Sequence, residues 1–162
     1  MAGASKRGTL QLHLADEAAT LAFGARLARA IEPGMSLHLR GDLGSGKTTL
    51  ARGLLRGLGY SGRVKSPTYT LVELYPFSRL NLYHFDFYRF RDPREWRDAG
   101  LDEYFNQAAV CLVEWPEKAG GLLPAADLDL ALGFAGDGRD LNVRARTESG
   151  KACIERLMQL PL

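Results

Sequence analysis

The chain has 162 residues, which suits one compact domain and is too short for two of ordinary size. Hydrophobic residues make up 46% of it and charged residues 25%, and these near-average fractions argue against a disordered chain. Lys and Arg number 21 and Asp and Glu 19, and the resulting net charge of +2 argues against a protein that holds nucleic acid by charge alone. No apolar run approaches the ~20 residues of a membrane span, so a cytoplasmic protein without membrane contact is expected.

Residues 1–8 are expected to form a disordered leader, because they are small or basic and lead into no apolar signal core. A single domain is expected over residues 9–162. Its first strand is predicted over 9–14, where leucines alternate with polar residues. Its first helix is predicted over 16–32, where apolar side chains recur every four residues and Asp16 is placed to cap the start.

A glycine-rich turn separates the second predicted strand from the second predicted helix. Residues 35–39 alternate between apolar and polar side chains, a pattern that predicts a strand covered on one face only. After the turn, an amphipathic helix is predicted over 47–58, and Gly59 is its expected stop.

Hairpins dominate the second half of the predicted fold. Two β-rich runs, 69–75 and 81–87, flank a turn-like segment and predict an antiparallel pair. The apolar run 108–113 fits a strand buried on both faces. The other predicted elements are a short helix from about Asp92 to Gly100, a second hairpin over 127–134 and 139–146, and a closing helix over 151–159. The expected fold class is α/β, with a mixed parallel and antiparallel sheet flanked by helices.

The phosphate-binding loop pattern is matched by one segment, Gly41-Asp42-Leu43-Gly44-Ser45-Gly46-Lys47-Thr48, between a predicted strand and a predicted helix. Its glycines let the backbone wrap a polyphosphate, and the helix start adds unpaired N–H groups and a positive dipole end. Lys47 supplies charge to the β and γ phosphates, Thr48 offers a hydroxyl ligand suited to Mg²⁺, and Thr49 can reach the α-phosphate. No Asn-Lys-x-Asp element that would select guanine is present, so ATP is the expected nucleotide.

Such a site also needs an acid at the end of a neighbouring strand. Glu114 ends the apolar run 108–113 and is the expected magnesium-associated acid, because its strand is predicted to be buried and parallel. Asp86 ends a less apolar run and is then free to orient the attacking water or to act in a switch. His84 is interpreted as structural, and Trp115 as packing either near the nucleotide or in the core.

Four arginines, at positions 89, 91, 94 and 97, alternate with acidic residues. They are interpreted as a solvated mixed-charge surface, and a partner-binding face is the alternative.

Four blocks in this order resemble the TsaE family (also called YjeE), the small bacterial ATPases of tRNA threonylcarbamoyladenosine synthesis. They are the loop 41–49, Ser66-Pro67-Thr68-Tyr69-Thr70-Leu71-Val72, His84-Phe85-Asp86-Phe87-Tyr88-Arg89, and Leu112-Val113-Glu114-Trp115-Pro116. The resemblance extends from about Leu10 to the C-terminus. It implies a single P-loop NTPase-like domain that binds ATP and Mg²⁺ and hydrolyses ATP slowly alone.

The resemblance also implies two partner proteins, TsaB and TsaD. Their complex transfers a threonylcarbamoyl group to the adenosine beside the anticodon, and ATP hydrolysis by the TsaE-like subunit resets it between turnovers. Contact with tRNA would be indirect.

Carried over by position, the resemblance implies roles for particular residues. Lys47, Asp86 and Glu114 would be catalytic, and Thr48 and Glu114 would lie at the magnesium. The segment 66–70 would be switch-like. The nucleotide would be contacted by Glu17, Gly44, Ser45, Gly46, Lys47, Thr48, Thr49, Trp115 and, in a Gly138-Arg139 pair, by Arg139.

Two other functions stay open. A small-molecule kinase would need an acceptor pocket and an arginine-rich lid, for which the arginines between 89 and 97 are the candidate. A nucleotide-gated binding module without useful turnover would need Asp86 for its partner but not for its nucleotide.

Overall fold

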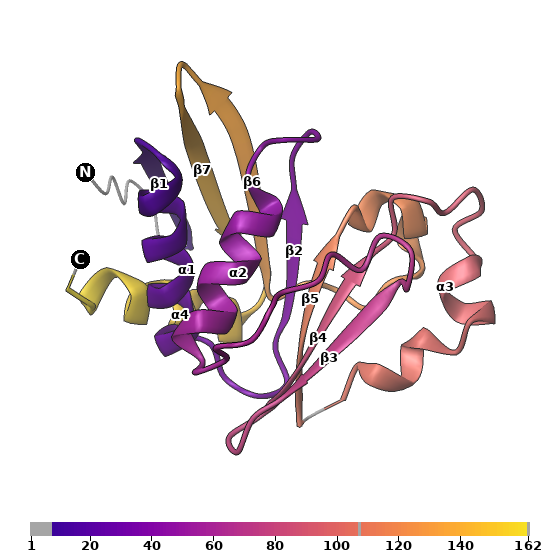
Figure 1. The fold of residues 1–162 in the computed structure, drawn as a ribbon. Helices are drawn as coiled ribbons and strands as arrows, with labels where there is room; N and C mark the ends of the chain where they lie inside the picture. Colours follow the sequence, from indigo (N-terminus) through magenta and orange to yellow (C-terminus); the bar gives the residue numbers. More distant parts are fainter. Residues whose placement is uncertain (1–7, 107, 162) are drawn as a thin grey trace.

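The computed structural model describes residues 8–106 and 108–161. Within them, seven strands form one sheet in the order β1-β7-β6-β2-β5-β4-β3 (Figure 1). The strands are β1 Thr9–Leu14, β2 Ser36–Arg40, β3 Val72–Pro76, β4 Asn81–Asp86, β5 Ala109–Glu114, β6 Leu128–Ala135 and β7 Gly138–Ala145. The helices are α1 Glu17–Ala30, α2 Lys47–Gly57, α3 Glu95–Asp98 and α4 Glu148–Gln159, with 3-10 turns η1 Leu101–Tyr104 and η2 Pro116–Leu122.

The sheet is mixed, as predicted. Strand β2 runs parallel to β5 and to β6, and β4 runs parallel to β5. The pairs β1–β7, β6–β7 and β3–β4 are antiparallel, so both predicted hairpins are present. The carboxyl ends of β2, β4 and β5 therefore lie at one edge, where the loop after β2 begins.

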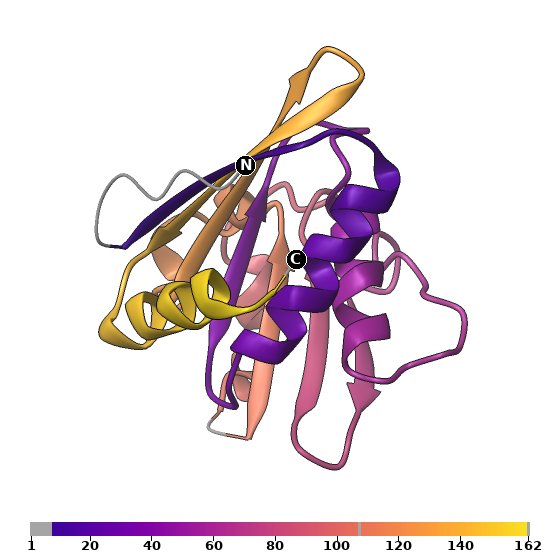
Figure 2. The same ribbon diagram turned by 90° about the vertical axis from the view of Figure 1, so that its left-hand side faces the viewer.

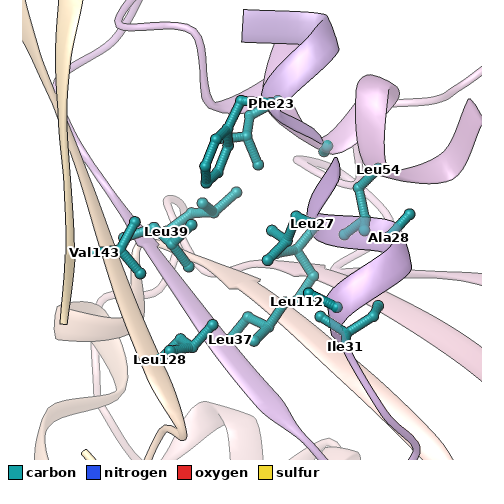
Figure 3. Packing of buried hydrophobic residues seen from close by; sticks show 14 of the residues in the cluster. Phe23, Leu27, Ala28, Ile31, Leu37, Leu39, Leu54, Leu112, Leu128 and Val143 are labelled. Atoms are coloured by element: carbon teal, nitrogen blue, oxygen red, sulfur yellow. The ribbon is translucent and has the colours of Figure 1, made fainter. Parts of the chain in front are cut away.

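The sheet lies between two layers of helices, and one hydrophobic cluster fills the space on each side of it. Helices α1, α2 and α4 cover one face of the sheet (Figures 1 and 2), and Figure 3 shows leucines of β2, β5 and β6 packed beneath α1 and α2. On the other face, aromatic residues of β4 pack with Trp96 of α3 and with η1 and η2. Strand β5 contributes to both clusters, since Leu112 faces the first and Val113 the second. This position explains why every residue of β5 is buried, as its apolar run predicts.

Strand β2 differs from its prediction. Its alternation predicted cover on one face only, but Ser36 and His38 are 6% and 7% exposed. The prediction is wrong because β2 is the central strand, and its polar face is closed by neighbouring charged groups. The Ser36 N–H donates to the Asp127 carboxylate at 2.7 Å, and His38 Nδ1 lies 3.8 Å from Asp129 Oδ1.

Element boundaries shift where a local feature overrides the apolar pattern. The predicted strand 69–75 begins only at Val72, because Leu71 has φ 70° in a turn closed by its N–H to the Pro67 carbonyl. The closing helix begins at Glu148 rather than at 151, because the Thr147 hydroxyl accepts from the Gly150 N–H and caps it. The predicted cap of α1 is confirmed, since Asp16 accepts from the Ala19 N–H at 2.8 Å.

Two further predictions concern the start of the chain and membrane-spanning helices. The expected leader over 1–8 falls, except for Gly8, outside the described residues. In the part of the chain that is described, no helix is long and apolar enough to cross a membrane.

Candidate nucleotide-binding site

The glycine-rich segment 41–46 joins the carboxyl end of β2 to the start of α2, as its motif predicts. Gly46 precedes the helix with φ 106°, a left-handed conformation that glycine adopts without strain. No side chain of the described residues caps this helix start. The first N–H groups of α2 are therefore free to bind an anion, and the helix dipole favours negative charge there.

Lys47 folds back into the site rather than into solvent. It is 5% exposed, its Nζ donates to the Gly41 carbonyl oxygen, and the same atom lies 3.8 Å from the centroid of the Trp115 ring. Burial lowers the pKa of the Lys47 amine below its ordinary value, although Glu114 and Asp86 act in the opposite direction. The amine is thus close to both predicted acids.

The two predicted acids lie side by side. Asp86 and Glu114 are direct partners in the parallel β4–β5 ladder, and their exposures are 4% and 3%. Asp86 accepts from the Thr68 hydroxyl at 3.1 Å and from the Tyr88 N–H at 2.8 Å. Burial raises the pKa of the Asp86 carboxyl above its ordinary value, and the charge of Glu114 adds to that rise. Two buried carboxylates this close favour a cation or a proton between them.

A cavity of about 330 Å³ brings most of the predicted site together. Leu43 through Thr49 of the glycine-rich loop and α2 form one wall, and Asp86 and Glu114 lie at the strand ends. The other lining residues are Ser66, Thr68, Tyr88 and Trp115. The segment 66–70, predicted to be switch-like, therefore reaches the cavity and is hydrogen-bonded to Asp86.

A second cavity of about 340 Å³ adjoins the same loop. It shares Gly44, Gly46 and Thr49 with the first, and it is lined also by Glu17 and Arg139. The remaining lining residues are Asp16, Thr20, Asp137 and Gly138. Glu17 at the start of α1 and Arg139 of β7 are far apart in the sequence, and the fold places both at this cavity.

Arg139 is bound to the loop itself. Its Nε donates to the Ser45 carbonyl at 2.9 Å and its Nη2 to the Gly44 carbonyl at 3.0 Å. Its guanidinium also lies 4.6 Å from the centroid of the Phe134 ring. The β6–β7 hairpin therefore braces the backbone of the phosphate-binding loop, a contact that sequence reasoning did not predict.

Sequence reasoning also missed the buried pair of His84 and Glu114, whose Nε2 and Oε2 atoms are 2.6 Å apart. A usable signal was present, because residues two apart on a strand share a face and so place His84 with Asp86.

The oxygen atoms in the first cavity suit Mg²⁺. No group of three or more His, Cys, Asp or Glu side chains that could hold a metal is found in residues 8–106 and 108–161. Mg²⁺ in nucleotide sites usually takes one or two carboxylates or hydroxyls and completes its shell with phosphates and water. Thr48, Asp86 and Glu114 all line this cavity and offer hard oxygen ligands of this kind.

The comparisons with known proteins converge on one family. The model of the family "Threonylcarbamoyl adenosine biosynthesis protein TsaE" matches residues 14–141. The chain is 44% identical to the tRNA threonylcarbamoyladenosine biosynthesis protein TsaE of Haemophilus influenzae over 151 residues, 90% of this chain and 96% of that one. It is 45% identical to the TsaE protein of Bacillus subtilis over 118 residues, 73% of each chain. The crystal structure of Bacillus subtilis YdiB superposes with a TM-score of 0.81 at 33% identity, covering 98% of this chain and 97% of the other.

Proposed function

The chain belongs to the TsaE family, and from this membership we propose that it is an ATP-hydrolysing accessory subunit of tRNA threonylcarbamoyladenosine biosynthesis. The observation that carries the ATPase proposal is one cavity that joins the phosphate-binding loop, Lys47 and two buried carboxylates. A cavity with these groups suits a magnesium–polyphosphate ligand.

The two cavities that adjoin the loop would divide the nucleotide between them. The triphosphate would lie along segment 44–49, where the α2 N–H groups face it and Lys47 exchanges the Gly41 carbonyl for phosphate oxygens. The adenosine would occupy the cavity lined by Glu17 and Arg139. Arg139, by holding the loop carbonyls, keeps the loop in a shape that receives the phosphates.

The Thr48 hydroxyl and the Glu114 carboxylate would hold Mg²⁺, which neutralises charge on the β and γ phosphate oxygens when bound. Asp86 would orient the attacking water, and its raised pKa suits a group that accepts a proton from water. Water adds to the γ-phosphorus, the bond to the bridging oxygen breaks, and ADP and phosphate leave. Lys47 stabilises the charge that develops on the transferred group.

We further propose that the protein acts in the cytoplasm with TsaB and TsaD, and that it meets tRNA only through that complex. Both relatives described above carry names from tRNA threonylcarbamoyladenosine biosynthesis, which supports a shared process. The near-neutral net charge of +2 supports an indirect contact with RNA.

The test is phosphate release from ATP, first with the chain alone and then with purified TsaB and TsaD. Slow release that rises with the partners, and that vanishes in Lys47→Ala and in Glu114→Ala, is the expected result. Transfer of phosphate to an added metabolite without free phosphate would favour a small-molecule kinase instead. Nucleotide binding with no release under either condition would favour a nucleotide-gated binding module.

A further inference from the structure

His84 lies in strand β4 with its side chain fully buried, and its Nε2 is 2.6 Å from Oε2 of Glu114 in β5. A carboxylate at this distance accepts, so the imidazole donates through Nε2–H. Nδ1 has no hydrogen-bond partner in the described part of the chain, which fits a ring that carries its hydrogen on Nε2. The imidazole is therefore oriented toward a single acceptor.

The orientation of the Glu114 carboxylate depends on one hydrogen bond, whereas that of the Asp86 carboxylate depends on two. Asp86 is held by the Thr68 hydroxyl and by the Tyr88 N–H. For the Glu114 carboxylate, His84 is the one hydrogen-bond partner among residues 8–106 and 108–161. A buried carboxylate with one partner takes its direction from that partner.

The register of the sheet makes the contact rigid. His84 and Asp86 share a face of β4, and Glu114 lies opposite Asp86 in the parallel ladder. The imidazole therefore reaches Glu114 from two residues back, at the inner side of the strand ends. Contact at Oε2 leaves Oε1 for the cavity that Glu114 lines with the phosphate-binding loop.

We propose that His84 is a positioning residue that orients the Glu114 carboxylate toward Mg²⁺. The inference rests on the proposed function, because it takes Glu114 as the acid that holds the magnesium. His84 itself does not touch nucleotide or metal. Removing its N–H frees the carboxylate to rotate and weakens the Mg²⁺-dependent part of nucleotide binding, while contacts of the loop with phosphate stay as they are.

Three substitutions separate the hydrogen bond from the packing. His84→Gln keeps an N–H donor the same number of bonds from Cα as Nε2. His84→Met has similar length and no donor, and His84→Asn places its amide one bond short. If His84 only fills space, the effects of these substitutions should follow side-chain volume. If His84 positions Glu114, His84→Gln should behave like wild type and the other two variants should not.

The measurement is the dissociation constant of a non-hydrolysable ATP analogue, in excess Mg²⁺ and in EDTA, by titration calorimetry. The constant in EDTA divided by the constant in Mg²⁺ gives the gain in affinity that the metal provides, and this ratio does not depend on turnover. We expect His84→Met and His84→Asn to reduce this ratio by about tenfold, with the constant in EDTA unchanged, and His84→Gln to restore most of it. A melting curve of each variant without nucleotide verifies that it is folded.

A double-mutant cycle with Glu114→Gln tests whether His84 acts through Glu114. In the Glu114→Gln background, His84→Met should cause no further loss of the ratio. A full ratio in folded His84→Met and His84→Asn, or an additive loss in the double variant, would overturn the inference for His84 alone. A wild-type protein whose affinity does not depend on Mg²⁺ would instead overturn the proposed magnesium site, and with it this inference.

Discussion

The Lys47 amine lies 3.8 Å from the centroid of the Trp115 ring and donates to the Gly41 carbonyl oxygen. An ammonium over an indole is stabilised by about 0.5–2 kcal/mol, more where water is excluded. Trp115 has a left-handed backbone, φ 55°, directly after β5, and this turn directs its ring toward the loop. The two residues therefore hold each other at the place where phosphate would bind.

Trp115 fluorescence should respond to nucleotide for this reason. When phosphate draws the Lys47 amine away, the indole loses a cation from its face and its emission changes. The other tryptophan, Trp96, is 2% exposed in the second hydrophobic cluster, and unlike Trp115 it does not line the cavity of the phosphate-binding loop. We expect the nucleotide-dependent change to disappear in Trp115→Phe and to persist in Trp96→Phe. A signal that follows Trp96 instead would contradict the exchange.

Lys47→Ala should remove phosphate affinity without reducing the stability of the free protein. Its amine is buried at a cost, which is why its pKa is lowered, so its loss removes that cost together with the contact to Trp115. We expect nucleotide affinity to fall by at least about tenfold, or 1.4 kcal/mol, with the melting temperature within about 2 °C of wild type. Lys118→Ala, at an exposed position, is the control. A melting temperature lowered as far as by a core truncation would count against this assignment.

Local signals explain how much of the site could be predicted. The loop, its helix and the acids after β4 and β5 depend on short-range patterns: glycine spacing, an apolar run and a strand end. Contacts between segments that are far apart in the chain have no such local pattern in the sequence. Arg139 is 95 residues from Gly44, and no feature near Arg139 in the sequence indicates that it holds loop carbonyls. The burial of β2 likewise depends on which strands flank it, so alternation alone predicted an open face that does not exist.

Arg139→Ala should weaken nucleotide binding by loosening the loop. The substitution removes hydrogen bonds to the Ser45 and Gly44 carbonyls, and hydrogen bonds with a charged donor contribute about 1.5–3 kcal/mol each. We expect the dissociation constant for ATP to rise by about tenfold, and hydrogen exchange of loop amides to speed up even without nucleotide. Arg144→Ala, at an exposed position on the same strand, should leave both unchanged. Unaltered loop exchange in Arg139→Ala would mean that the brace has no effect on the loop.

Gly53→Ala should destabilise the fold by separating α1 from α2. A Cβ at Gly53 would collide with the Leu21 carbonyl, just as one at Gly24 would lie 2.5 Å from the Leu50 carbonyl oxygen. Backbone cannot yield as a flexible side chain does, so the clash should exceed the ~1 kcal/mol that alanine gains in helix propensity. We expect a net loss of about 1–3 kcal/mol in urea unfolding. Gly121→Ala, where a Cβ meets nothing within 4 Å, is the control. Equal stability of the two variants would refute close packing of the helices.

His38 should make the stability of the protein fall in mild acid. Its side chain is buried in the central strand, and burial lowers its pKa from 6.5 to about 4, against the opposing charge of Asp129. Below pH 6.5 the unfolded chain takes up a proton that the folded protein resists until about pH 4. The unfolded state then binds more protons, so the free energy of unfolding falls by about 2–3 kcal/mol between pH 7 and pH 4.

The measurement for His38 is urea unfolding at a series of pH values for wild type and for His38→Asn. The remaining histidines and the carboxylates are common to both proteins, so the difference between the two curves isolates His38. We expect that difference to be constant above pH 7 and to shift in favour of the variant as the pH falls from 6.5 toward 4. Parallel curves over this range would show that His38 binds a proton equally well in the folded and unfolded chains, contrary to its burial beside Asp129 and Arg40.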